Sequence, residues 1–257
     1  MLDIIDSHVH ITENGKWMDT NYDSSLKNLL NEIHLASVNK AILVAIEGVV
    51  KNDYIAEIAS EYSEIFYAFC SVNPAIIKFE DFFKNKNDIF IGLKIHPRFH
   101  NYSLKNNDVI RFFKNVEKIP NFIVMVDCWF SDSDSINLIR EYINFFNNFK
   151  NIRFILAHSG GFQYNLIIPL AIEENCYLDL SYTPFILKKY RDDLYNDFFS
   201  KLRLVNSSKL LFGSDFPEFS IKKSISLLKE TLKIHNYSQS EQRKIFYSNI
   251  NNLVKSV

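Results

Sequence analysis

Two histidines separated by one residue, His8 and His10, have a type and spacing that could bind a metal ion. Residues i and i+2 of an extended strand point to the same side, so both imidazoles could reach one ion. Neutral imidazole is the commonest metal ligand in proteins. Asp6 lies two residues earlier on the same side, where its carboxylate could orient a ligand or hold the strand in place. The alternative for a bare His-x-His pair is a surface or capping pair.

Asp215 follows a short apolar run, within Gly213-Ser214-Asp215-Phe216-Pro217. Glycine allows the backbone to turn sharply after a strand, and proline prevents the strand from continuing. A carboxylate at this place could bind a metal, activate a bound water or carry a proton. The alternative is that Ser214 and Asp215 cap the N-terminus of a helix.

His158 precedes two glycines, within Ala157-His158-Ser159-Gly160-Gly161. At the end of a strand its imidazole could act as an acid, a base or an oxyanion stabiliser. The two glycines would let a substrate approach the backbone closely. The alternative is an ordinary loop histidine in a glycine turn.

Short apolar runs alternate with segments of helical periodicity along the chain. We predict helices between strands, one of them near 187–202, and strands at 2–5, 41–46, 65–69, 89–95, 122–126, 152–157, 176–180 and 209–212. Uninterrupted apolar strands separated by helices are typical of a parallel sheet covered by helices. Eight such units favour an α/β fold of the (β/α)₈ TIM-barrel type.

An open, doubly wound sheet is the alternative architecture. No glycine-rich phosphate loop follows any predicted strand, and the chain has only six glycines, which favours the barrel. Ser238-Gln239-Ser240-Glu241 predicts a capping box that begins an extra C-terminal helix. No linker or repeat divides the sequence, so residues 1–257 are expected to form a single domain.

The composition argues against several classes of protein. A formal net charge of −1 over 257 residues provides no basic surface for nucleic acid. No uncharged apolar stretch is long enough to span a membrane, and the first residues do not resemble a signal peptide. The three widely spaced cysteines, Cys70, Cys128 and Cys176, are expected to be reduced thiols of a cytoplasmic protein.

In a barrel of this type, the active site lies at the C-terminal ends of the strands. Closure of the barrel places the eighth strand beside the first, which would bring Asp215 next to His8 and His10. Polar residues suited to catalysis fall at or near the predicted strand ends: His8, His10, Lys94, His96, Asp127, His158, Asp179 and Asp215.

The order of these motifs resembles the amidohydrolase superfamily, in particular the branch that includes aminocarboxymuconate-semialdehyde decarboxylase and related hydrolases. By this resemblance, His8, His10 and Asp215 would be metal ligands, and His158 would be a catalytic residue near the metal. Dimers are common among members, so a homodimer is compatible with the resemblance. The resemblance spans nearly the whole chain and rests on Asp6-x-His8-x-His10, Gly92–Pro97, His158–Gly161 and Gly213–Pro217.

The fifth strand departs from the family pattern. Members usually end this strand with a histidine ligand, whereas this chain has Asp127. We expect Asp127 to be a fourth ligand; the alternative is that it orients His158. A carboxylate makes the site harder and more anionic, which would favour Mn²⁺ or weaken the metal site. One divalent ion is expected, Zn²⁺ with Mn²⁺ as the alternative. A carbamylated Lys94 that bridges two ions, as in some members, is a further alternative.

The residues and the resemblance together predict a metal-dependent hydrolase. It would act on a small-molecule carbonyl, amide or lactone through a metal-activated water, with Asp215 and His158 as catalytic residues. The alternatives are a metal-dependent decarboxylase of a small carboxylic acid and a metal-free barrel that binds ligands without catalysis. Substrate binding is expected from Lys94, His96, Arg98 and Trp129. An apolar rim is expected from Trp17, Tyr22, Trp129, Phe130 and Tyr182.

Overall fold

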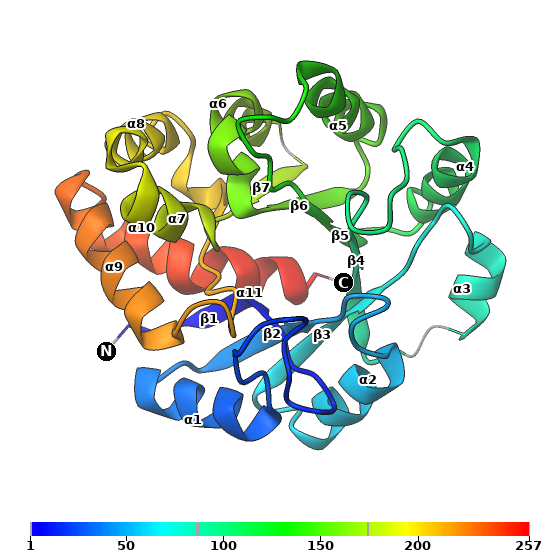
Figure 1. Ribbon diagram of the computed structural model, residues 1–257, viewed down its shortest axis with the longest axis horizontal. Coiled ribbons are helices and arrows are strands. Elements are labelled where there is room, and N and C mark those ends of the chain that lie inside the picture. Colours follow the sequence, from blue (N-terminus) through cyan, green and yellow to red (C-terminus); the bar gives the residue numbers. More distant parts are fainter. Residues whose placement is uncertain (1, 86–87, 174, 257) are drawn as a thin grey trace.

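Eight parallel strands, hydrogen-bonded in the order β1 to β8, form the centre of the molecule. The computed structural model describes residues 2–85, 88–173 and 175–256. Hydrogen bonds from Ser7 N to Phe212 O and from Asp215 N to His8 O, both 2.9 Å, join β8 to β1 and close the barrel (Figure 1). The (β/α)₈ TIM barrel is therefore confirmed. The strands are β1 Ile5–Val9, β2 Lys40–Val44, β3 Phe66–Ser71, β4 Phe90–Ile95, β5 Ile123–Asp127, β6 Arg153–Ala157, β7 Cys176–Asp179 and β8 Leu210–Leu211.

Helices surround the barrel and connect successive strands (Figure 1). In α1, for example, the Ser25 side chain caps the N-terminus by accepting a hydrogen bond from Asn28 N, and Leu29 and Ile33 are buried at helical spacing. The helices are α1 Leu26–Ala36, α2 Asn52–Glu61, α3 Phe79–Asn85, α4 Asn107–Val116, α5 Ile136–Asn148, α6 Tyr164–Ile167, α7 Thr183–Tyr190, α8 Asp192–Leu202, α9 Ile221–Ile234, α10 Gln239–Arg243 and α11 Asn249–Val254.

Two predicted elements differ from the structure. The first strand begins at Ile5 rather than at residue 2, and it includes Asp6, Ser7 and His8. These polar residues can lie inside a buried strand because residues distant in sequence supply their hydrogen-bond partners. The helix predicted near 187–202 is two helices, α7 and α8, because the chain leaves helical geometry at Arg191, where φ is −143°.

A second apolar layer fills the inside of the barrel, separate from the larger core between strands and helices. It contains inward-facing residues such as Ile42, Phe69 and Met125, together with Ile250 and Leu253 of α11. In Figure 1, α11 runs across the barrel. The apolar filling and α11 therefore occupy the interior beneath the site, and the polar strand ends lie at the opposite, C-terminal face.

The C-terminal segment agrees with the sequence prediction. Ser238 and Glu241 form the predicted capping box at the start of α10, and α11 completes the extra C-terminal helical segment. Cys70, Cys128 and Cys176 are buried, and none of them takes part in a disulfide bond. Within the described residues, no helix is both long enough and apolar enough to cross a membrane.

Candidate active site

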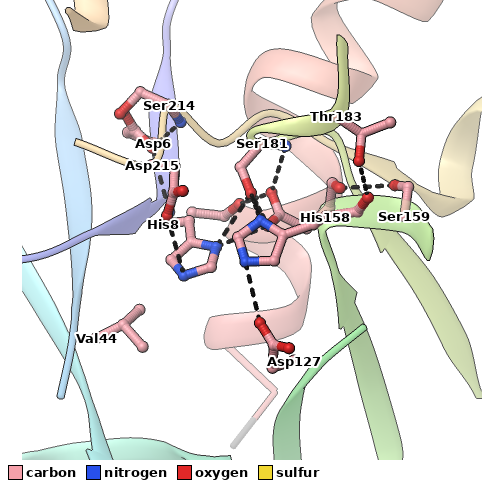
Figure 2. Close-up of polar contacts among 12 residues, drawn as sticks. Asp6, His8, Val44, Asp127, His158, Ser159, Ser181, Thr183, Ser214 and Asp215 are labelled. Carbon is pink, nitrogen blue, oxygen red and sulfur yellow. Dashed lines mark hydrogen bonds and ion pairs between the residues drawn. The ribbon is translucent and has the colours of Figure 1, made fainter. Parts of the chain in front are cut away.

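His8, His10 and Asp215 converge where β1 meets the loop that follows β8. Figure 2 shows His8 and Asp215 at this place. Asp215 Oδ1 lies 3.7 Å from His8 Nε2 and 3.5 Å from His10 Nε2. All three side chains are buried. Barrel closure thus places the predicted strand-8 carboxylate beside the strand-1 histidines.

Both histidines are held so that Nε2 faces this meeting point. His10 Nδ1 lies 2.7 Å from the Val44 carbonyl oxygen, which can only accept a hydrogen bond, so Nδ1 carries the proton. His8 Nδ1 lies 2.8 Å from Asp179 Oδ2, which fixes the same tautomer. Each Nε2 is therefore left with a lone pair directed toward Asp215.

This arrangement fits a divalent metal ion. His8 Nε2 is buried and has no hydrogen-bond partner among the described residues. Tetrahedral ligands about 2.0–2.2 Å from zinc lie about 3.3–3.6 Å from one another, close to the distances between Asp215 and the two imidazoles. A second group of His8, His158 and Asp179 also clusters. Its centre is less open, because Ser181 Oγ hydrogen-bonds Asp179 at 2.6 Å and lies 3.0 Å from His158 Nδ1.

Asp6 ties β1 to the loop that carries Asp215. Its Oδ1 accepts hydrogen bonds from His8 N at 3.1 Å and from Ser214 N at 2.9 Å. Burial raises the pKa of Asp6 to about 7. This carboxylate therefore fixes the backbone on both sides of the candidate metal centre, as the strand-holding role predicted for it requires.

His158 lies beside His8, with the two rings stacked at a centroid distance of 5.1 Å. Its Nδ1 faces Ser181 Oγ, and its Nε2 lies 3.3 Å from Asp127 Oδ2 (Figure 2). Burial works to lower the pKa of His158, but the nearby carboxylates of Asp215 and Asp127 outweigh it and raise the pKa.

Five non-glycine residues around the site have a positive φ: Met18, His158, Ser159, Tyr182 and Asp215. This backbone conformation is unfavourable for residues other than glycine and often marks functional sites. Side-chain hydrogen bonds hold part of it in place, because Ser159 Oγ donates to Asp179 O at 2.6 Å and Thr183 Oγ1 donates to His158 O. The protein thus maintains a strained backbone at and beside residues that line the pocket.

Asp127, at the end of β5, lies between two histidines. Its Oδ2 is 3.3 Å from His96 Nε2 and 3.3 Å from His158 Nε2. His96 Nδ1 accepts a hydrogen bond from Phe99 N at 3.2 Å, so Nε2 carries the proton toward Asp127. Burial works to raise the pKa of Asp127, but His96, His158 and Lys94 hold it well below its usual range. Asp127 does not belong to the cluster of His8, His10 and Asp215, although its buried Oδ1 has no described partner.

One cavity of about 280 Å³ is lined by His8, His10, Asp127, His158 and Asp215. Lys94 is only 1% exposed and forms no ion pair with any described residue. Arg98 also lines the cavity, but its guanidinium donates to Trp129 O and lies 3.4 Å from Asp134. Arg98, which is predicted to bind substrate, is therefore partly engaged in bracing the loop after β5, whereas Lys94 is free to meet a ligand.

The predicted apolar rim is only partly correct. Trp17, Trp129 and Tyr182 line the cavity. Phe130 is completely buried and packs against Tyr142 instead. Tyr22 does not line the cavity, because it lies on the exposed outer part of its loop.

Sequence reasoning assigned no role to Asp179, Ser181 or Glu218. The position of Asp179 at a strand end was a usable signal, but its partner, His8, is 171 residues away. Glu218, three residues after Asp215, lines the cavity. Burial raises its pKa, with Asp215 contributing.

The amidohydrolase family model matches residues 5–254. No curated protein sequence matches the chain. A probable 2-pyrone-4,6-dicarboxylic acid hydrolase from Acinetobacter baumannii, crystallised with citric acid, is 15% identical, with 99% of this chain and 100% of the other covered and a TM-score of 0.74.

Two further solved structures have the same fold. A zinc-bound amidohydrolase from Burkholderia multivorans is 13% identical, with 99% and 100% of the two chains covered and a TM-score of 0.76. A 5-carboxyvanillate decarboxylase from Sphingomonas paucimobilis is 10% identical, with 100% of each chain covered and a TM-score of 0.72. Because the amidohydrolase family model matches residues 5–254, almost the full length of this chain, the chain belongs to the amidohydrolase family.

Proposed function

We propose that this protein is a metal-dependent hydrolase of a small molecule that carries an amide, lactone or other reactive carbonyl group. One observation carries this proposal: the Nε2 atoms of His8 and His10, each 3.5–3.7 Å from Asp215 Oδ1, converge with fixed tautomers. We propose one ion, Zn²⁺ with Mn²⁺ as the alternative. Asp127 is proposed as the fourth ligand through its unpartnered Oδ1.

The chain's own residues would manage the protons of the reaction. A divalent ion supplies Lewis acidity, polarising a carbonyl oxygen and acidifying water. Asp215 would accept the proton of the attacking water, because its carboxylate faces both histidines and the cavity. His158 lines the same cavity and would deliver a proton to the leaving group, while Asp127 holds its ring in place.

The cavity wall suggests how the substrate is held. Lys94 is a buried cation without an ion pair among the described residues, so it would bind an anionic group of the substrate. Arg98 would add N–H donors, and the ring of His96, whose Nε2–H faces Asp127, would pack against the substrate. Trp129, whose ring centroid lies 4.7 Å from that of Tyr182, would pack against the apolar part of the substrate.

Metal analysis of the purified protein tests the proposal. His8→Ala should abolish stoichiometric binding of Zn²⁺ or Mn²⁺, whereas His34→Ala, on the outer helix α1, should retain it. Hydrolysis in ¹⁸O-labelled water should place one ¹⁸O atom in the product. A wild-type protein that binds neither ion would overturn the proposal and favour a metal-free binding protein.

Decarboxylation of a small carboxylic acid is the second candidate. It is favoured by Lys94, which could hold a carboxylated substrate, and by His158, which could protonate the carbon that loses CO₂. Reaction in D₂O separates the two candidates. A decarboxylase would release CO₂ and place deuterium on carbon, and it would not incorporate ¹⁸O from water into a new acid group.

A further inference from the structure

Trp17, on the loop between β1 and α1, covers one face of His10. The two rings are stacked with centroids 4.7 Å apart and planes inclined by 21°. Trp17 is itself only 3% exposed. The indole therefore packs directly against a candidate ligand.

Glu218, on the loop after β8, holds the indole in place. Trp17 Nε1 donates a hydrogen bond to Glu218 Oε1 at 2.7 Å. The backbone N of Glu218 donates to Asp215 O at 2.9 Å, so Glu218 follows directly from the turn that carries Asp215. A continuous set of contacts thus runs from His10 through Trp17 and Glu218 to Asp215.

The loop around Trp17 is folded on itself rather than extended. Trp17 N donates to Tyr22 O at 3.4 Å, Thr20 N donates to Trp17 O at 3.1 Å, and Ser24 N donates to Gly15 O at 3.0 Å. Gly15 has a φ of +70°, and a Cβ there would lie 3.2 Å from the Ser25 Cβ. This local hydrogen bonding gives Trp17 a defined backbone position from which to reach His10.

We propose that Trp17 and Glu218 form a latch that positions His10 for metal binding. Neither residue is a ligand in this proposal, which rests on the proposed metal centre. The Val44 carbonyl fixes one edge of the imidazole, and the indole face blocks rotation of the ring. The Trp17–Glu218 hydrogen bond joins the loop after β1, next to His10, to the loop after β8, which carries Asp215. An ordered latch therefore raises metal affinity, and bound metal in turn stabilises the latch.

Metal titration of four variants tests the latch. Glu218→Ala and Trp17→Phe each remove the hydrogen bond, and each should weaken Zn²⁺ or Mn²⁺ binding about 10-fold. The double variant should lose little more than either single variant, because both remove the same interaction. Glu218→Gln keeps an acceptor oxygen and should restore binding to within about 3-fold of the wild-type affinity.

Two control variants separate a specific effect on the position of His10 from a general effect of removing an aromatic side chain or a carboxylate. Trp129→Phe alters the second tryptophan of the chain, which contacts Tyr182 and Phe162 but neither strand-1 histidine. Glu141→Ala removes another carboxylate that fastens a loop, through hydrogen bonds to Ser103 and Leu104. Both should leave metal affinity unchanged. If Glu141→Ala weakens binding as much as Glu218→Ala does, or if Glu218→Ala binds like the wild-type protein, the latch is refuted.

NMR spectra of the metal-free protein give a readout that does not depend on metal. In Glu218→Ala, the Trp17 indole N–H should exchange faster with solvent, and the ring-proton resonances of His10 should shift toward those of an unstacked imidazole while those of His34 stay fixed. Unchanged Trp17 and His10 resonances would refute the latch. If the wild-type protein binds no metal but these resonances change, the proposed function fails and the positioning of His10 stands.

Discussion

Asp179 allows a direct test of how the protein fixes the ligating nitrogen of His8. Its Oδ2 lies 2.8 Å from His8 Nδ1, and neither side chain is exposed to solvent. The other oxygen, Oδ1, accepts a hydrogen bond from Ser181 N at 3.2 Å. A backbone N–H can only donate, so in Asp179→Asn the amide oxygen should stay at Oδ1 and the NH₂ group should take the place of Oδ2.

The substitution would therefore reverse the hydrogen bond to His8. An NH₂ group that faces His8 Nδ1 favours the tautomer whose proton is on Nε2, the atom 3.7 Å from Asp215. That proton removes the lone pair that a metal requires. We expect metal affinity to fall about 10–100-fold, which corresponds to about 1.4–2.8 kcal/mol. The free energy of unfolding of the metal-free protein should change by less than about 1 kcal/mol, because the side chain keeps its shape.

Metal titration and urea unfolding in the presence of a chelator measure these two quantities separately. Asp179→Ala is the comparison, because it leaves Ser181 Oγ and His8 Nδ1 without their present partner. It should lower the free energy of unfolding by about 1–3 kcal/mol as well as weakening metal binding. If Asp179→Asn binds metal within 2-fold of the wild-type affinity, the tautomer argument is wrong.

Three further predictions concern stability. Ile250→Ala removes a completely buried side chain of α11 and should lower the free energy of unfolding in urea by about 2–5 kcal/mol; a change below about 1 kcal/mol would mean that α11 lies outside the cooperative core. Gly161→Ala would place a Cβ 2.5 Å from a backbone oxygen at φ +58°, and it should cost over about 1 kcal/mol more than Gly48→Ala, where φ is +85° and the nearest atom is 3.8 Å away. The hydrogen bond from Arg203 lowers the pKa of Glu241 from 4.5 to about 2, so its stabilisation is complete above pH 4.5 and is lost as the pH falls toward 2. Glu241→Gln should lower the free energy of unfolding by under about 1 kcal/mol at pH 7, because the Arg203–Glu241 pair lies at the surface. In chemical unfolding measured at a series of pH values, this variant should lose less stability between pH 4.5 and 2 than the wild-type protein does. An equal loss in the two proteins would contradict the prediction.

The barrel could be predicted from the sequence because its signal is local. Buried strands appear as apolar runs, and the longer helices carry buried residues at helical spacing, as Leu29 and Ile33 do in α1. The errors occur where distant contacts override this local pattern. Ser7, for instance, is polar but lies inside β1, because its hydroxyl donates to Phe212 O at 2.8 Å, 205 residues away.

Part of the candidate site could also be predicted from the sequence. The histidines of strand 1 and Asp215 could be placed together because β8 and β1 must be neighbours in a closed barrel. Asp179 could not be given a role in this way, since β7 and β1 are not hydrogen-bonded neighbours and their side chains meet across the barrel interior. The pairing of Trp17 with Glu218 joins two loops, whose conformation the strand and helix pattern does not specify.

The charge at the C-terminal face gives an independent argument for a cation. Asp127, Asp179 and Asp215 are at most 5% exposed, and burying a carboxylate costs several kcal/mol unless opposite charge and hydrogen bonds compensate for it. Among the described residues that line the cavity, Lys94 is a cation without an ion pair, while Arg98 is partly committed to Asp134. The tautomers of His8 and His10 leave both rings neutral when a metal binds. A divalent ion beside Asp215 would add positive charge next to these carboxylates, and Lys94 would then remain available for an anionic substrate.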